Sequence, residues 1–361
     1  MNKILVVSNG NIGDFIMQTG ALKLLRENCP KDRIVLIASV KTKEFAERLN
    51  FYDKVFYTDF SFSGGKIKQI FDRLFWLFRN YFKIKRERFD DCIFLDHSRF
   101  FARAFPLFKI KNFIGPSTWW CGNNIKNPNV SRLTHIVELP ANSDEVHLTN
   151  RYQAIVRNYC GSFNSAKPYL APSSKETLQR VETLLQKTNR HSIVLSLRGD
   201  NIKGNQKIYP RQHCIEFIKL LSKEGDFDFY FAGTKDFYNY ADFVKKELKG
   251  LNIVNLCSKT SLLDLKALFE KIDLAISVDT GAIHIAAEAG AKIIGLFGAN
   301  PKNSIPVSHQ TEILYVKEPC SPCHYSRTVL KIPCPFGDNP KCLEDITPKM
   351  IVEAVKRLIK L

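Results

Sequence analysis

A glycine-containing loop near the start of the chain combines an accessible backbone with a carboxylate. Gly10 and Gly13 lie within the segment Ser8–Asp14, which follows a short apolar run. Glycine adopts backbone angles that other residues resist and lets a ligand approach closely. Asp14 opens the next helical pattern, where it is either a helix cap or a general base that takes a proton from a hydroxyl. The segment lacks the third glycine of the dinucleotide fingerprint, which argues against a nicotinamide-dependent dehydrogenase.

A second loop, Asp279–His284, offers a phosphate site at the start of a helix. Thr280 and Gly281 form the turn between an apolar run and a helical pattern. The first amides of a helix point outward and carry partial positive charge, so they favour a phosphate or diphosphate. Asp279 either accepts hydrogen bonds from sugar hydroxyls or caps the helix, and His284 either faces the ligand or is a satisfied buried histidine.

The elements that must position these loops alternate along the whole chain. Strand-like apolar runs span 3–8, 33–39, 90–95, 109–114, 191–197, 227–231, 252–256, 273–278 and 292–297. Helical patterns span 12–28, 212–223, 241–249 and 262–271. Short buried strands that alternate with helices are typical of α/β folds, in which helices cover both faces of a parallel sheet. Ligands of such sheets bind beyond the carboxyl ends of the strands.

A break in both periodicities divides the chain into two halves of similar size. Two prolines and two serines lie within Lys167–Ser174, a composition typical of a loop. We therefore expect one domain over 1–170 and a second over 171–346, facing each other across a cleft. The remaining segment, 347–361, predicts a terminal helix that is capped by Thr347 and packs back on the first domain.

The composition predicts a globular protein with an anionic partner. Apolar residues make up 45% of the 361 residues and charged residues 25%, which is ordinary for a folded chain. Lys and Arg number 53 against 36 Asp and Glu, a net charge of +17. Such an excess favours nucleic acid, a phosphorylated substrate or an acidic membrane surface. No apolar run approaches the roughly 18 residues of a spanning helix and no export signal opens the chain, so we expect a cytoplasmic protein.

The segment Lys66–Arg88 is both basic and aromatic. It contains eight Lys or Arg residues and two acidic ones, with apolar residues at helical spacing. One interpretation is a helix that packs on the first sheet and exposes a basic face. The other is an interfacial helix with aromatic side chains in the headgroup layer of an anionic membrane. Nucleic acid is a weaker candidate, because no recognition-fold signature accompanies the segment.

Four of the ten cysteines have a spacing that could hold a metal. They are Cys320, Cys323, Cys334 and Cys342. The C-x2-C-x10-C-x7-C pattern is compatible with a structural zinc site. Reduced, packed thiols and a redox pair are the alternatives.

Taken together, the two loops resemble those of glycosyltransferase family 9, the ADP-heptose:lipopolysaccharide heptosyltransferase family. Lys207–Pro210 is similar to the family's Lys-x-Trp-Pro element, with Tyr in place of Trp. Ala232–Asp236, Lys259–Leu262 and Leu296–Pro301 resemble three further family segments. The resemblance covers most of the second half and about the first 40 residues, whereas 50–165 carries no recognised motif.

The resemblance implies a GT-B architecture, in which two Rossmann-like, doubly wound domains face a central cleft. It implies an inverting transferase that needs no metal and no cofactor. The first domain would bind the acceptor, with Gly10 and Gly13 in its acceptor loop and Asp14 as the catalytic base.

The second domain would bind the nucleotide-sugar donor. The implied donor residues are Lys207, Asp236, Asp279, Thr280, Gly281 and His284. Lys207 and the amides of Thr280 and Gly281 would hold the diphosphate. Asp236 would bind the donor ribose, while Asp279 and His284 would line the pocket.

The resemblance also implies a substrate class and a location. A heptose or related sugar would pass from an ADP-sugar to the inner core of lipopolysaccharide or a related surface glycan. The partners would be a nucleotide-sugar donor and an anionic glycolipid acceptor, met at the inner face of the cytoplasmic membrane by a peripheral protein. The alternatives are a GT-B transferase with another nucleotide-sugar donor and a non-catalytic basic protein of the same fold that binds membranes or anions.

Overall fold

The chain consists of two compact units, Met1–Ala171 and Pro172–Leu361. The structure is a computed structural model. It describes residues 1–60, 66–96, 98–118, 127, 129–139, 146–185, 188–199, 207–298, 302–308, 310–321, 323, 332, 334–337 and 340–360. Each unit is built on its own six-stranded sheet.

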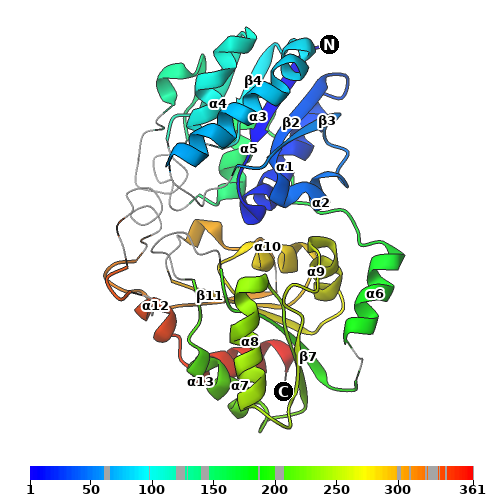
Figure 1. Cartoon of the computed structure of the whole chain (residues 1–361), viewed down its shortest axis with the longest axis vertical. Helices are drawn as coiled ribbons and strands as arrows, with labels where there is room; N and C mark the ends of the chain where they lie inside the picture. Colours follow the sequence, from blue (N-terminus) through cyan, green and yellow to red (C-terminus); the bar gives the residue numbers. More distant parts are fainter. Residues whose placement is uncertain are drawn as a thin grey trace. The chain divides into compact units, whose positions relative to one another are not determined.

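The first unit is a parallel, doubly wound sheet (Figure 1). Its strands are β1 (Lys3–Ser8), β2 (Arg33–Ser39), β3 (Lys54–Thr58), β4 (Asp91–Phe94), β5 (Asn112–Pro116) and β6 (His135–Val137). Its α-helices are α1 (Ile12–Asn28), α2 (Lys43–Ala46), α3 (Lys66–Glu87), α4 (Arg99–Ala104) and α5 (Leu148–Cys160). The strand order is β3-β2-β1-β4-β5-β6, and every neighbouring pair is parallel.

Burial on both faces of the first sheet explains why its strands are continuous apolar runs. Leu5 and Val7 of β1 belong to a core that α3 and α4 cover, with Trp76 and Phe101 as two of its large members. Side chains alternate along a strand, so Val6 points to the other face, where it is also fully buried. The helices α1 and α5 pack against each other, and α5 contacts β5 and β6.

The second unit repeats this arrangement. Its strands are β7 (His191–Ser196), β8 (Phe227–Phe231), β9 (Asn252–Asn255), β10 (Leu274–Val278), β11 (Ile293–Phe297) and β12 (Thr311–Tyr315). Its α-helices are α6 (Lys175–Leu185), α7 (Arg211–Leu221), α8 (Lys235–Glu247), α9 (Leu262–Phe269), α10 (Gly281–Glu288), α12 (Lys341–Glu344) and α13 (Pro348–Ile359). The strand order is β12-β11-β10-β7-β8-β9, again with parallel neighbours.

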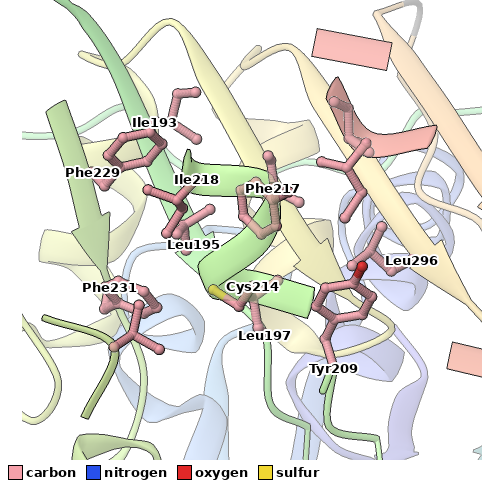
Figure 2. Packing of buried hydrophobic residues seen from close by; sticks show 14 of the residues in the cluster. Ile193, Leu195, Leu197, Tyr209, Cys214, Phe217, Ile218, Phe229, Phe231 and Leu296 are labelled. Atoms are coloured by element: carbon pink, nitrogen blue, oxygen red, sulfur yellow. The ribbon is translucent and has the colours of Figure 1, made fainter. Parts of the chain in front are cut away.

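One apolar core joins α7 and α13 to the second sheet. Phe217 and Cys214 of α7 are fully buried beside Leu195 of β7 (Figure 2). The helix α13 starts at the predicted cap, where the Met350 amide donates to Thr347 Oγ1 over 3.4 Å. Its apolar residues join this core and it contacts α7. Its buried side is therefore occupied within the second unit.

The predicted fold class of two doubly wound parallel sheets is confirmed. Several predicted elements, among them β1, α1, β2 and β8, have the predicted bounds. The edge strands β3, β6 and β12 were not predicted, because they bury only one or two side chains each and so lack a continuous apolar run. The helix α8 starts at Lys235 rather than at residue 241, because its first turns bury Phe237 and Tyr240.

The carboxyl end of α3 is tied to two strands by one acidic side chain. Glu87 accepts hydrogen bonds from Arg33 Nε over 2.9 Å and from Lys54 Nζ over 2.8 Å. The hydrogen bond from Arg33, helped by Lys54, lowers the pKa of Glu87 to about 2. The charged form of Glu87 therefore stabilises the folded unit.

Glu87→Gln should lower the free energy of unfolding by about 1–2 kcal/mol at neutral pH, since the carboxylate is partly screened by solvent. A carboxyl whose folded pKa is lowered stabilises the protein above its ordinary pKa and loses that effect as pH falls through the folded value. The gap between wild type and variant should therefore close between about pH 4.5 and about pH 2. Urea denaturation across this range measures it. The control is Glu27→Gln, which removes a carboxylate that forms an exposed 3.9 Å pair with Lys23. An equal loss of stability in the control would contradict the stabilising role of Glu87.

Candidate functional site

Each predicted loop lies where the order of the strands in its sheet reverses. In the first sheet β1 lies between β2 and β4, and in the second β7 lies between β8 and β10. Connections that leave two such neighbouring strands in opposite directions open a crevice beyond the carboxyl ends, which is where open α/β sheets bind ligands. The loop before Asp14 follows β1, and the loop that starts at Asp279 follows β10.

In the first unit, Asp14 is packed closely against its own loop. The Asn11 amide donates to Asp14 Oδ2 over 3.1 Å, which makes Asp14 a capping partner of α1. A Cβ atom on Gly10 would lie 2.6 Å from the Cβ of Asp14, so only glycine fits there without a shift. A carboxylate has several acceptor positions, so a capping contact does not prevent Asp14 from also accepting a proton. Gly13 lies in the first turn of the same helix, and both glycines are half-buried.

A second carboxylate, Asp96, holds the same loop and was not singled out from the sequence. Its Oδ2 accepts from the Asn9 amide over 2.7 Å, and its Oδ1 accepts from the Ser98 amide over 2.8 Å. Burial raises the pKa of Asp96 to about 6; the charge of Asp14 adds to this rise and the two amides oppose it. The signal that could have found Asp96 is its place directly after a buried strand, but only the strand order shows that β4 adjoins β1.

In the second unit, Lys207 and Asp279 form an ion pair at the switch point. Lys207 Nζ donates to Asp279 Oδ2 over 2.5 Å, and the two side chains are only 16% and 10% exposed. A short antiparallel pairing brings Lys207 there: the Gly199 amide donates to the Lys207 carbonyl over 2.7 Å, and the Tyr209 amide donates to the Leu197 carbonyl over 3.0 Å. An ammonium carries three donors, so Lys207 can bind an anion while it holds Asp279.

Two neighbours fix the position of Lys207. A Cβ atom on Gly199 would lie 2.9 Å from the Cβ of Lys207 and 3.3 Å from Cγ2 of Thr280, so a glycine lets these segments approach. Tyr209 is fully buried, and its hydroxyl donates to the Ile346 carbonyl over 2.7 Å. Burial raises the pKa of Tyr209 above its ordinary value. The tyrosine therefore anchors the segment that carries Lys207; Figure 2 shows its side chain among the buried residues of the core.

The helix α10 begins beside this ion pair. Thr280 caps it, with its Oγ1 accepting from the Ala282 amide over 3.0 Å. Gly281 opens the helix, and His284 is buried in the first turn. Lys207, Asp279, Thr280 and Gly281 are therefore brought together at the carboxyl end of β10, where the partial positive charge of the helix start adds to that of the ammonium.

Asp236 lies at the same edge of the sheet but one strand further on. It is exposed in the first turn of α8, which follows β8. The strand β8 pairs with β7, whose carboxyl end leads to Lys207. The segments 200–206 and 299–301, which include Asn300 of the family-like turn, lie outside the described residues.

The cysteine pattern does not assemble a metal centre in the described part of the chain. Cys323, Cys334 and Cys342 are buried and Cys320 is half-buried, all as free thiols. Within the described ranges, no group of three or more His, Cys, Asp or Glu side chains is placed to hold a metal ion.

Comparison with known proteins shows which sequence family and which fold the chain has. The sequence model of glycosyltransferase family 9 (heptosyltransferase) matches residues 129–332, more than half of the chain. Lipooligosaccharide heptosyltransferase 2 of Campylobacter jejuni is 26% identical over 171 residues. This match spans 46% of the chain and about half, 51%, of that curated relative.

Among the solved structures that match nearly the whole chain are two heptosyltransferases of E. coli. The E. coli ADP-heptose LPS heptosyltransferase II is 18% identical, with a TM-score of 0.72 over 99% of this chain and 98% of that one. The E. coli heptosyltransferase WaaC with ADP-2-deoxy-2-fluoro heptose is 15% identical, with a TM-score of 0.64 over 99% of both chains. At these identities the likeness shows the fold, which is the GT-B fold of these proteins.

The Lys207–Asp279 pair should show strong coupling in a double-mutant cycle. Lys207→Met and Asp279→Asn should each lower the free energy of unfolding by about 1–3 kcal/mol, because each takes a counter-charge from a mostly buried group. The double variant should lose clearly less than the sum of the two. Chemical denaturation of the four proteins measures this.

The exposed pair Lys246–Asp242, at 2.8 Å on α8, is the matched control and should show little or no coupling, because solvent screens it. Additive effects at Lys207 and Asp279 would show that the two groups do not form a working ion pair in solution.

Proposed function

Because the chain belongs to glycosyltransferase family 9, the heptosyltransferase family, we propose that it transfers a heptose or a related sugar from an ADP-sugar to a surface-glycan acceptor. The acceptor class is the inner core of lipopolysaccharide or a related glycolipid. The observation that carries the proposal is the Lys207–Asp279 pair at the start of α10. A cation and helix-terminal amides in one place are what a nucleoside diphosphate requires.

The donor diphosphate binds at the second unit. The Lys207 ammonium contacts a phosphate oxygen while Asp279 keeps it in place. The amides of Thr280 and Gly281 point at the same group from the helix start. During transfer, the bond between the anomeric carbon and the diphosphate oxygen breaks, and negative charge builds on that oxygen. Fixed donors stabilise this charge where it develops, and they need not reorganise during the reaction.

Asp14 of the first unit activates the acceptor. Its carboxylate takes the proton of the acceptor hydroxyl as the hydroxyl oxygen bonds to the anomeric carbon. Attack on the face opposite the leaving diphosphate inverts the configuration of the sugar. Lys207 and the helix amides supply the charge stabilisation that a metal would otherwise give, so the proposed reaction needs no metal. Asp96 positions the loop that carries this base through its contact with the Asn9 amide.

ADP is the proposed nucleotide. A solved structure of the same fold holds an ADP-heptose analogue, and heptosyltransferases are among the matched relatives. Asp236, at the same sheet edge, binds the donor ribose, and His284 with Asp279 lines the pocket. If the donor were another nucleotide sugar, only the nucleobase and the exact sugar of this proposal would change.

We place the reaction at the inner face of the cytoplasmic membrane, where a glycolipid acceptor is embedded. The net charge of +17 favours a phosphorylated, anionic acceptor. Among the described helices, none is long and apolar enough to cross a membrane. The protein is proposed to work there as a peripheral enzyme.

Asp14→Asn should abolish most turnover while it leaves the fold and donor binding intact. The asparagine oxygen can still accept from the Asn11 amide, so α1 keeps its cap, but an amide cannot take up the acceptor proton. We expect sugar transfer from ADP-heptose to fall by about 10²–10⁴-fold, with unchanged ADP affinity by calorimetry.

Asp242→Asn, which removes a carboxylate of α8 paired with Lys246, is the control and should keep full turnover. Full turnover in Asp14→Asn would reject Asp14 as the base. Absence of transfer by the wild type despite ADP binding would favour a non-catalytic protein of the same fold.

A further inference from the structure

The helix α3 is held to the first unit by one side only. Trp76 is 4% exposed and donates through Nε1 to the Tyr57 carbonyl over 2.7 Å. Its ring meets those of Phe60 and Phe101 at centroid distances of 5.8 and 5.4 Å. Ile84, two turns later on the same side, is fully buried. These contacts fix which side of α3 faces outward.

The outward side of α3 is apolar from Ile67 to Phe82. Seven large apolar side chains there are between 54% and 77% exposed. We call them the α3 apolar strip: Ile67, Ile70, Phe71, Leu74, Phe75, Phe78 and Phe82. Most of them recur at intervals of three or four residues, which places them on one side of a helix. A contiguous exposed apolar surface of this kind is typical of an interaction site.

A line of cations runs beside the apolar strip. Their spacing places these cations on one side of the helix, and all of them are exposed. We call them the basic flank: Lys68, Arg79, Lys83 and Arg86. The helix has two acidic residues, and both have basic partners: Asp72 pairs with Lys68, and Glu87 binds Arg33 and Lys54. The exposed surface of α3 is therefore apolar in its centre and positive along its flank.

An anionic lipid bilayer matches this surface better than other occupants do. An amphipathic helix in the bilayer plane buries its apolar side at the boundary of headgroups and acyl chains, and its cations meet acidic headgroups. A second copy of this chain would bring the same excess of positive charge, +17, against the basic flank. Nucleic acid would satisfy the cations but would leave most of the aliphatic and aromatic side chains in water.

We propose that α3 lies flat on an anionic lipid bilayer, with the α3 apolar strip among the acyl chains and the basic flank against the headgroups. The inference deepens the proposed function, on which it rests for its membrane-embedded acceptor. It assigns the membrane contact to seven named side chains. It also explains why an aromatic-rich helix leaves so many large side chains outside the core of its own unit.

Vesicle sedimentation of the full chain tests the proposal without donor or acceptor, so its result does not depend on glycosyl transfer. Vesicles of phosphatidylcholine with 30% phosphatidylglycerol, roughly the anionic content of an acidic membrane, are compared with pure phosphatidylcholine. We expect binding to the anionic vesicles to be at least tenfold tighter, and to weaken as salt screens the charges.

Phe71→Ser combined with Phe78→Ser should reduce binding to anionic vesicles by about tenfold or more, because both side chains leave the acyl layer. Both are exposed, so the fold should survive, which circular dichroism checks. Phe163→Ser, at a 99% exposed loop position of the same unit, is the matched control and should bind as the wild type does. Lys83→Gln combined with Arg86→Gln should bring anionic binding closer to that of neutral vesicles.

Equal binding to both vesicle types, or unchanged binding of the Phe71→Ser and Phe78→Ser double variant, would overturn the proposal. A lipid-free dimer that this double variant dissociates would overturn it too, because a second copy would then cover the strip. If vesicle binding holds but sugar transfer is absent, the membrane assignment stands and the proposed function fails.

Discussion

The mostly buried ion pair between Lys207 and Asp279 is the interaction on which the proposed donor site depends. It joins the segment after β7 to the loop after β10. These are the two neighbouring strands between which the strand order of the second sheet reverses. A cation held at such an edge, beside the start of α10, is stabilised by its own carboxylate before any ligand arrives. The close approach at Gly199 and the buried anchor Tyr209 keep it there. The ammonium of Lys207 is therefore held in place before the proposed anionic ligand binds.

The first unit has the same type of strand order but different charged groups at its switch point. Its switch point holds two carboxylates, Asp14 and Asp96, where the second unit holds an ammonium. The charge of Asp14 helps to raise the pKa of Asp96, so the two acidic groups share one electrostatic environment. A carboxylate pair suits proton transfer from a hydroxyl, and a cation suits a diphosphate. In the proposed function, the two copies of one fold thus supply a carboxylate for the acceptor and a cation for the donor diphosphate.

The sequence predicted most of the strands, because strands buried on both faces are uninterrupted apolar runs. It did not predict the edge strand β12, which buries few side chains, or the role of Asp96, which depends on β4 being the neighbour of β1. The contact between Lys207 and Asp279 joins residues far apart in the chain, so only a family resemblance placed them in one site. For α3 the sequence left two interpretations open. In the structure some of its aromatic side chains pack in the core, as Trp76 does, and others are exposed, as Phe78 is. Spacing along the chain alone could not show which aromatic residues are buried.

Thermal unfolding with ADP, UDP, GDP and CMP tests the central claim, that the second unit binds a nucleoside diphosphate through Lys207. A nucleotide at 100 times its dissociation constant stabilises the folded protein by about 2.7 kcal/mol. The account predicts that ADP raises the melting temperature of the wild type well above the other nucleotides, and that Lys207→Met loses most of this rise. A melting temperature that responds to none of the four nucleotides, or a rise with ADP that is equally large in Lys207→Met, would contradict it.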